Sequence, residues 1–493
     1  MNELLDLFHL VKSRVPLITI ETRDEKEAVR LIASLGNSTK RPVYGWNLVR
    51  GFSLLDRDGN IDGTNRLEPT EVLNVIYENY TSALFILIDY HPYLQNDRNV
   101  RLIKEIALNY ERLRNTVFFI STQIELPDGI KHLSAKFDLA FPTDKEIKSF
   151  LTQLIEKWQS ENPRKKVEVD ETILSVFIKN LHGLSFPEIK RILYNALRDN
   201  AINKDDIPEI TKAKYELLNK ANVLYFEHDT SSFSEVGGLQ NLKEWLEKRK
   251  KIFIGEVKTT AVDVPKGVLL LGVQGSGKSL AAKAVAGTWG IPLLRLDFGT
   301  LYNKYYGETE RKTREALKTA DMMAPCVLWI DEIEKGLATD SGGDSGTSKR
   351  VLGTFLTWMA EKKTLVFLVA TANDIQNLPP ELLRKGRMDE IFFVDLPGEE
   401  IRKEILTIHL KKRNLNPGNF DLDKIAGACE GFSGSEIEQV IVSGFYSVIG
   451  GYMQLNTEIL LEEIKKTRPL SVVMYENIDA MREWVKDRTV LAN

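Results

Sequence analysis

The chain has 493 residues, more than one hydrophobic core normally serves, so we expect two or three domains. Its 66 basic and 70 acidic residues give a formal net charge of -4, and its basic clusters are short, which disfavours a nucleic-acid groove. The two cysteines, Cys326 and Cys429, predict buried thiols in a reducing compartment, and the six histidines lack metal-ligand spacing.

The first residues do not look like a targeting segment. Glu3 and Asp6 stand where a signal peptide would be basic, and the Arg- and Ser-rich character of a transit peptide is missing. The longest apolar runs are far shorter than the ~18 residues that suggest a membrane span. We therefore expect no membrane span, and a protein that works where it is made.

Residues 1–202 have the pattern of an α/β domain without a phosphate-binding loop. Short apolar runs that end in polar residues, FILIDY at 85–90 and FFIST at 118–122, are typical of buried parallel strands. Residues 17–25 read LITIETRDE, with neither glycine nor lysine, and their acids would repel phosphate. We expect a scaffold or docking role here, followed by a polar linker over residues 203–232.

A complete phosphate-binding loop, GVQGSGKS, occupies residues 272–279 between the apolar run VLLL and the helical pattern LAAKAVA. Its glycines allow conformations and close approaches that a Cβ would block, so that backbone N–H groups can point at phosphates. Lys278 would reach the β- and γ-phosphates, and Ser279 would ligate Mg²⁺. The residues expected to contact the phosphates are Gly272, Gly275, Ser276, Gly277, Lys278 and Ser279.

A second motif, VLWIDE at 327–332, argues strongly against the alternative that this loop is merely a flexible strand-to-helix turn. Asp331 follows four buried-type residues, so it should emerge at the carboxyl end of a parallel strand, near the Mg²⁺ site. Glu332 could polarise the attacking water as a general base. Together the two motifs predict ATP hydrolysis with Mg²⁺ as cofactor.

Five further motifs carry less information when each is taken alone. They are FSEVGGL at 233–239, KYYGE at 304–308, LVFLVATAN at 365–373, LPPELLRKGRMD at 378–389 and GFSGSEI at 431–437. Locally the first is only a turn, the tyrosines could be core residues, Asn373 could cap a helix and one arginine could lie on a surface helix. In the last, Ser433 is a credible N-cap, with Glu436 completing a capping box.

The order of all these motifs from about Phe233 resembles that of the AAA family of ring-forming ATPases, over roughly half the chain. The resemblance implies a parallel-sheet ATPase core at 233–398 and a helical lid with a tail at 399–493. It places Val236 and Gly237 beside the adenine and Gly434 near the adenosine. It also implies that Asn373 positions the attacking water.

The same resemblance assigns residues that work between subunits. Arg384 and Arg387 would be arginine fingers that reach the nucleotide of the neighbouring subunit, a role worth ~10³ to 10⁵ in rate. The family often has Arg after the aspartate, whereas this chain has Asp389-Glu390, so the subunit contact can differ in detail. Tyr305, with Tyr306 beside it, would face the central pore and grip a protein, and the polar residues 340–348 stand where a second pore loop is expected.

Five segments of the first half parallel five of the second in the same order, at offsets of 242 to 255 residues. The parallel pairs are 42–44 with 292–294, 85–90 with 327–332, 118–122 with 367–371, 137–142 with 392–397, and 183–189 with 431–437. Short apolar strands can match by chance, which leaves an unrelated α/β domain as the alternative, but five matches in the same order favour a degenerate AAA-like α/β domain. Tyr90 replaces the catalytic glutamate, and no arginine string follows the sensor-like strand.

The sequence predicts an α/β fold in which a P-loop AAA module follows a degenerate copy, and the resemblance implies an ATPase that forms a homo-hexamer and remodels a protein partner. The rival hypothesis is an ATP-gated scaffold that binds a partner without threading it. A nucleic-acid motor is disfavoured by the acidic balance. The chain as a whole resembles an AAA-domain protein of cyanobacteria and algal plastids, which implies a cyanobacterial cytoplasm or plastid stroma.

Overall fold

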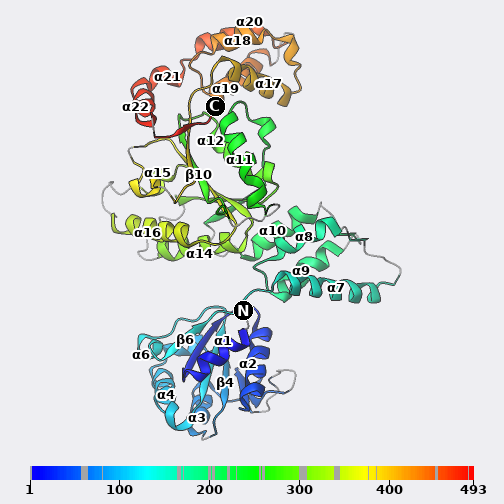
Figure 1. The fold of residues 1–493 in the computed structure, drawn as a ribbon, viewed down its shortest axis with the longest axis vertical. Coiled ribbons are helices and arrows are strands. Elements are labelled where there is room, and N and C mark those ends of the chain that lie inside the picture. Colours follow the sequence, from blue (N-terminus) through cyan, green and yellow to red (C-terminus); the bar gives the residue numbers. More distant parts are fainter. Residues whose placement is uncertain are drawn as a thin grey trace. The chain divides into compact units, whose positions relative to one another are not determined.

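The computed structural model divides the chain into two compact units, each built on one large sheet (Figure 1). Met1–Lys166 and Gly183–Asn195 form the first unit, and Val167–His182 and Ala196–Asn493 form the second. The described residues are 3–56, 61, 65–79, 81–163, 168–169, 171–197, 201–202, 206–218, 223–228, 230–254, 257, 261–298, 308–337, 345–375, 377–384, 386–449, 454–486 and 488–493.

The first unit contains a six-stranded sheet in the order β3-β2-β4-β5-β1-β6. Its strands are β1 (Leu17–Glu21), β2 (Val43–Asn47), β3 (Gly51–Leu54), β4 (Leu84–Ile88), β5 (Thr116–Ser121) and β6 (Ser134–Phe137). Only the edge strand β3 pairs antiparallel, with β2. Strands β4 and β5 are buried throughout, as expected for parallel strands with both faces covered.

Helices cover both faces of this sheet (Figure 1). The apolar side chains of α1 (Glu3–Lys12) and α2 (Glu25–Thr39) pack on one face, and those of α3 (Pro69–Glu78) and α4 (Asp97–Leu108) pack on the other. The shorter helices are η1 (His91–Gln95), α5 (Tyr110–Leu113) and α6 (Asp128–Lys131), and the unit also contains α7 (Asp144–Glu161) and nearly all of α9 (Phe186–Ala196).

The second unit contains a seven-stranded sheet in the order β15-β14-β10-β13-β12-β11-β9. Its strands are β9 (Leu224–Glu227), β10 (Gly267–Gly272), β11 (Leu293–Leu296), β12 (Cys326–Ile330), β13 (Val366–Ala372), β14 (Glu390–Val394) and β15 (Val490–Leu491). Only β9 pairs antiparallel, with β11. The two-residue strands β7 (Glu168–Val169) and β8 (Ala201–Ile202) pair separately.

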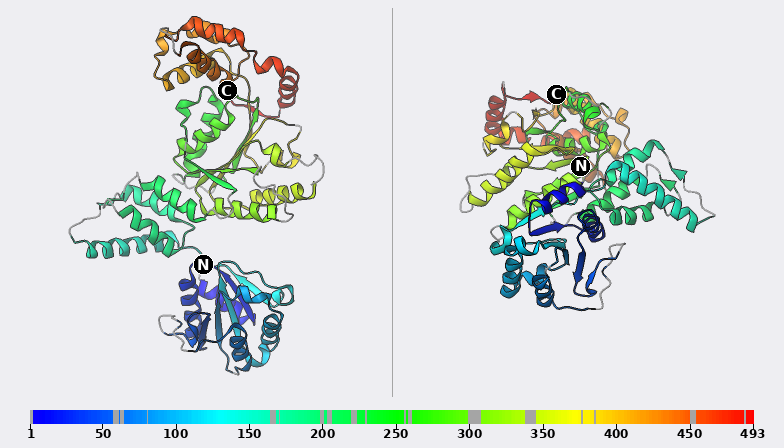
Figure 2. Two further views of the ribbon diagram at one scale, coloured as in Figure 1. Left: turned by 180° about the vertical axis from the view of Figure 1, so that it is seen from behind. Right: turned by 60° about the horizontal axis from the view of Figure 1, so that its bottom comes forward.

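Around this sheet, α11 (Gln240–Phe253) and α12 (Lys278–Trp289) share one hydrophobic core with β10 and β13. Helices α14 (Glu308–Met322) and α16 (Ser345–Glu361) pack against each other, away from α11 and α12 (Figure 2). The remaining elements outside the lid are α8 (Glu171–Leu181), α10 (Asp206–Leu218), η3 (Phe233–Glu235), α15 (Ile333–Leu337) and η4 (Pro380–Leu383).

A separate small helical core follows β14, where the resemblance implies a helical lid. Its elements are α17 (Glu399–Lys412), η5 (Pro417–Asn419), α18 (Leu422–Ala428), α19 (Gly434–Val448) and α20 (Thr457–Lys466). Ser433 caps α19 and its N–H donates to Glu436 Oε2 at 2.8 Å, which confirms the predicted capping box. Helices α21 (Leu470–Val473) and α22 (Tyr475–Val485) lead back to the sheet through β15.

The two large sheets share the order of five parallel strands. Numbered in chain order within each unit, these strands run 2-3-4-1-5 in both sheets, and an antiparallel edge strand lies beside strand 2. The second sheet adds a sixth parallel strand, β15, beside strand 5. The parallel between the two halves that the sequence predicts is thus also a shared order of these five strands. At the position that parallels Glu332, however, the first unit has Tyr90, which is 1% exposed and donates its hydroxyl to the Pro69 carbonyl at 2.7 Å. A buried phenol in this position cannot act as a carboxylate base.

Residues 203–232, predicted to be a linker, contain helix α10 and the edge strand β9. Their polar residues prompted that prediction, but Leu218 and Leu224 are buried at 3% and 1% exposure, and β9 joins the seven-stranded sheet beside β11. The segment therefore supplies structure to the second unit as well as connecting the halves.

Helix α10 also buries a lysine. Lys214 is 1% exposed, and its Nζ has no hydrogen-bond partner among the described residues. Burial lowers the pKa of Lys214 to about 7, although the nearby Cys326 thiol opposes the shift. Burial also raises the pKa of Cys326 to about 12, so both groups are neutral at mildly alkaline pH.

Replacing Lys214 with Met is therefore expected to remove a rise of stability with pH. Above pH ~7 the unfolded chain holds a proton on Lys214 that the folded protein does not, so Lys214 contributes a rise in wild-type stability of up to ~1.4 kcal/mol per pH unit until ~10. The raised pKa of Cys326 opposes this rise above pH ~8.5 in wild type and variant alike. Urea unfolding at pH 7.5, 8.5 and 9.5 measures the free energy of unfolding of wild type and of Lys214→Met. The matched control is Lys212→Met, because Lys212 is an exposed lysine on the same helix. A difference between wild type and Lys214→Met that stays constant with pH would contradict the assignment.

Candidate active site

The phosphate-binding loop lies at the junction of β10 and α12, which confirms the strand-to-helix context predicted from the sequence. Gly275 and Gly277 have φ values of 77° and 96°, in the region that side chains rarely adopt. A Cβ on Gly272 would stand 2.1 Å from the Val394 carbonyl oxygen. The glycines are thus required by the backbone itself, and they leave the N-terminus of α12 open to an anion.

Lys278 lies in this loop and is 6% exposed. Its Nζ donates to the carbonyl oxygens of Gly272 at 2.8 Å and Val273 at 2.7 Å. Burial lowers the pKa of Lys278 to about 8, and the carboxylates of Glu334 and Asp331 oppose that shift. The ammonium is therefore held by loop carbonyls at a position where phosphate oxygens could take their place.

Ser279 and Asp331 meet across the site. The Ser279 hydroxyl donates to Asp331 Oδ1 at 3.1 Å, and the hydroxyl of Thr371 at the end of β13 donates to the same oxygen. These are hard oxygen donors on a partly hydrated edge of the sheet, a set that suits Mg²⁺. The residues present thus fit the metal that the loop motif implies. The hydroxyl of Ser276 is buried without a partner among the described residues, so it could also serve a ligand.

Glu332 and Asn373 are in direct contact. Asn373 Nδ2 donates to Glu332 Oε1 at 2.8 Å, while the other carboxylate oxygen pairs with Lys335 Nζ at 2.5 Å. Glu332 has a φ of 48°, and its N–H donates to Thr371 Oγ1 at 3.0 Å. Because the Glu332 backbone is in the left-handed conformation, its side chain points in a different direction from that of Asp331. A non-glycine residue in that conformation is uncommon.

Two residues of this site were missed from the sequence. Thr371 bonds both Asp331 and the Glu332 backbone, and Glu334, 4% exposed, accepts the Asn373 N–H at 2.9 Å. Burial raises the pKa of Glu334, whose Oε2 has no partner among the described residues. Two features of the sequence could have indicated them: Glu334 is the third acid of the DEIE string at 331–334, and Thr371 carries a hydroxyl two residues before Asn373.

The structure also brings the adenine-side candidates to the lid and the loop. A Cβ on Gly237 would lie 2.9 Å from Ile405 Cγ1, and a Cβ on Gly434 would lie 3.7 Å from Ile405 Cδ1 and 3.5 Å from the Gly275 carbonyl. The Ser435 N–H donates to that carbonyl at 3.1 Å. Val236, 5% exposed, is the buried side chain of this turn. Ile405 of the lid therefore lies close to both Gly237 and Gly434, and the segment of Gly434 and Ser435 contacts the phosphate-binding loop at Gly275.

Arg384 and Arg387 lie away from these residues. They precede β14, whose residues Glu390 to Val394 pair in register with Val268 to Gly272 of β10. The arginines therefore lie at the amino edge of the sheet, and the phosphate-binding loop lies at the carboxyl edge, about 13 Å along the strand at ~3.3 Å per residue. Arg384 is exposed, whereas Arg387 donates to the Glu381 carbonyl at 2.5 Å.

Tyr305 and Tyr306 lie outside the described residues. Of the predicted second pore loop, residues 340–344 lie outside them too, and residues 345–348 form the start of α16.

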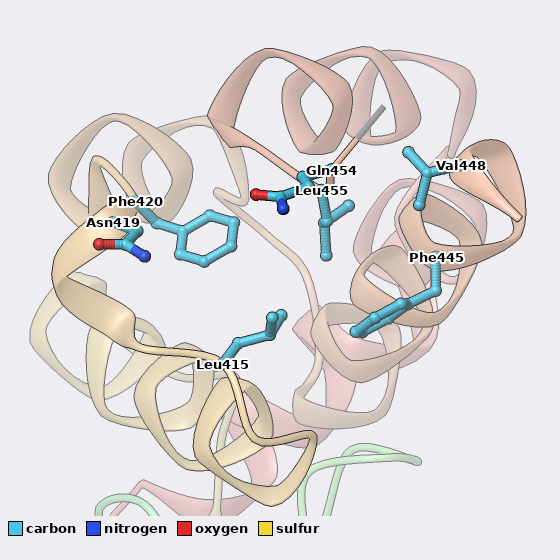
Figure 3. Close-up of a pocket in the computed structure, with 7 residues that line it drawn as sticks. All are labelled: Leu415, Asn419, Phe420, Phe445, Val448, Gln454 and Leu455. Atoms are coloured by element: carbon cyan, nitrogen blue, oxygen red, sulfur yellow. The ribbon is translucent and has the colours of Figure 1, made fainter. Parts of the chain in front are cut away.

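A cavity of about 390 Å³ lies within the lid, apart from the site residues (Figure 3). It is lined by Leu415, Asn419, Phe420, Phe445, Val448, Gln454 and Leu455. Its lining is largely apolar and carries no charge, so it does not extend the phosphate site. Within the described part of the chain, every helix is too short or too polar to cross a membrane.

Comparison with known proteins agrees with this geometry. Residues 268–396 match the ATPase family associated with various cellular activities (AAA). Residues 3–139 match the SpoVK-like AAA ATPase N-terminal domain, and residues 145–221 match the SpoVK-like AAA ATPase second domain. The predicted α/β class, with an AAA module that follows an N-terminal region, is thus confirmed. The two family matches before residue 222 divide that region into two domains.

Similarity to whole proteins extends over nearly the full chain. The AAA domain-containing protein ycf46 of Pyropia yezoensis is 36% identical over 491 residues, 99% of this chain and 98% of that protein. Its counterpart in Guillardia theta is 34% identical over 488 residues, 98% and 95% of the two chains. The proteasome-activating nucleotidase of Aeropyrum pernix is 34% identical over 277 residues, 53% of this chain and 66% of that protein.

The phosphate-binding loop after β10, the carboxylates after β12 and the helical lid thus occur in a chain that matches AAA domain-containing proteins over nearly its full length. The predicted resemblance to AAA-domain proteins of algal plastids is confirmed. By sequence and by fold, the chain belongs to the AAA family of ATPases, whose AAA domain binds nucleotide.

Proposed function

We propose that this protein is a Mg²⁺-dependent ATPase whose site is formed by residues of β10, α12, β12 and β13. Lys278 holds the β- and γ-phosphates, while Ser279 and Asp331 hold Mg²⁺, which when bound would neutralise charge on the phosphates. The observation that carries the proposal is the Glu332 carboxylate, fixed by Asn373 Nδ2 at 2.8 Å one residue after Asp331. A carboxylate so placed can accept a proton from the attacking water, with Asn373 orienting that water.

We further propose that the active unit is a homo-oligomeric ring, by expectation a hexamer. Within one chain, Arg384 and Arg387 lie at the amino edge of the sheet, opposite the phosphate-binding loop. They can stabilise the charge of the transition state only at a site other than their own, and a head-to-tail ring offers that site in the next subunit. Residues 233–398 form the ATPase core in this proposal, and 399–493 form the lid and tail.

The work done by hydrolysis is proposed to be remodelling of a protein partner, gripped by Tyr305 and Tyr306, with residues 1–202 as a scaffold or docking domain. The similarity to proteasome-activating nucleotidases over 53% of the chain supports a partner that is a protein. The relatives among algal plastid proteins support a photosynthetic cell, in the plastid stroma or cyanobacterial cytoplasm. The alternative is an ATP-gated scaffold without threading.

The test is specific ATPase activity measured across a wide range of protein concentration. A shared site requires two subunits, so activity per chain should rise with concentration and reach a plateau when the ring is complete. Activity that is independent of concentration, with stable monomers, would replace the ring with a monomeric switch. Slow turnover that Tyr305→Ala leaves unchanged would favour the scaffold over the remodelling enzyme.

A further inference from the structure

The segment that follows α22 is built into the edge of the ATPase sheet. In β15, Val490 and Leu491 pair in parallel with Phe392 and Phe393 of β14. Ala492 is fully buried in the core shared with α11 and α12, and its N–H donates to the Phe393 carbonyl at 2.9 Å. A two-residue strand with a buried neighbour has a defined position, unlike a frayed tail.

Residues 490–493, called here the edge clamp, also bind the N-terminus of α11. The Leu242 N–H donates to the Ala492 carbonyl at 3.2 Å, and Asn241 Nδ2 donates to the carbonyls of Leu491 at 3.1 Å and Asn493 at 2.6 Å. The Leu239 N–H donates to Asn493 Oδ1. Leu239 is the N-cap of α11 and has no polar side chain, so the Ala492 carbonyl accepts the Leu242 N–H that a capping side chain would accept, and Asn493 accepts the N–H of Leu239 itself.

The backbone bound by Asn493 belongs to the adenine-side turn, residues 236–239. Gly238 has a φ of 67°, and a Cβ there would lie 2.7 Å from Asn493 Oδ1. From the other side, Glu404 Oε2 accepts the Gly238 N–H at 2.8 Å, and Lys243 Nζ donates to the Val236 carbonyl at 2.8 Å. The turn is thus held between the lid and the edge clamp.

We propose that the edge clamp fixes the shape of the adenine-side turn, which makes Asn493 a positioning residue for the base of the nucleotide. The inference rests on the proposed function, because it requires Val236 and Gly237 to face the adenine. Losing the Asn493 side chain frees the Leu239 N–H and loosens the turn, while the phosphate-binding loop keeps all its own contacts. Base recognition should therefore weaken separately from phosphate recognition.

The experiment compares the affinity of the full-length protein for MgATP and for Mg-tripolyphosphate, the same anion without a base, by calorimetry. Asn493→Ala should weaken ATP binding about tenfold, the effect of one lost, partly buried hydrogen bond, and leave tripolyphosphate binding unchanged. Asn493→Asp keeps the acceptor oxygen and should restore ATP binding. Asn456→Ala, which removes an N-cap bond of 3.1 Å to the Ile459 N–H in the lid, is the matched control and should change neither ligand.

Equal weakening of both ligands by Asn493→Ala, or no effect on either, would overturn the proposal. If that variant does not fold, Asn241→Ala removes two other bonds of the edge clamp and should give the same separation. Failure of the proposed function would look different, because wild type would then bind neither ligand, or Lys278→Ala would bind ATP as wild type does.

Discussion

Glu332→Gln is expected to lower kcat by ~10² to 10⁴-fold while ATP binding is retained. The amide has the size of the carboxylate and can still contact Asn373, but it cannot accept a proton from water. The phosphate-binding loop, Ser279 and Asp331 are untouched, so the substrate should bind and remain unhydrolysed. The variant is thus expected to trap ATP.

Single-turnover hydrolysis and the release of labelled ATP distinguish loss of chemistry from loss of binding. Glu361→Gln, an exposed glutamate at the end of α16, makes the same chemical change away from the site and should match wild type. Lys278→Ala is the opposite case, because it should lose ATP binding itself. Equal turnover and equal ATP release in wild type and Glu332→Gln would remove Glu332 as the base.

Local sequence was enough to predict the parts of the site that depend on neighbouring residues. The glycine loop between an apolar strand and a helix, and the capping box of Ser433 and Glu436, each lie within eight residues, and both are confirmed. Asp331 does lie directly after a fully buried strand beside β13. The fold class followed from the same motifs, because their order specifies which strands and helices alternate.

What could not be predicted depends on contacts between distant residues. Glu334 resembles any acid in the first turn of a helix until β13 brings the Asn373 N–H to its carboxylate. Strand β9 is a four-residue segment between polar residues, too short to be told from a linker until it pairs with β11. The edge clamp joins Leu239 to Asn493, and no periodicity at either position signals the other.

Arg384→Ala is expected to reduce ATP turnover by ~10³ or more while leaving ATP binding intact, because an arginine finger acts on the transition state. Arg384 is exposed and lies at the edge of the sheet opposite Lys278 in its own chain. The loss should therefore appear at the neighbour's site. Arg14→Ala, an exposed arginine paired with Glu111 in the first unit, is the control that should keep wild-type turnover.

Mixing two inactive variants tests this directly. Lys278→Ala keeps its arginines but cannot bind ATP, and Arg384→Ala binds ATP but supplies no finger. A shared site is complete where a subunit with the Arg384→Ala change supplies the intact loop and a neighbour with the Lys278→Ala change supplies the intact arginine. In a random equal mixture each condition is met half the time, so about a quarter of wild-type turnover should be recovered. Mixed oligomers are verified by two affinity tags. Mixed rings with no recovered turnover would mean that Arg384 serves its own chain or has no catalytic role, and the ring would then lose its function in hydrolysis.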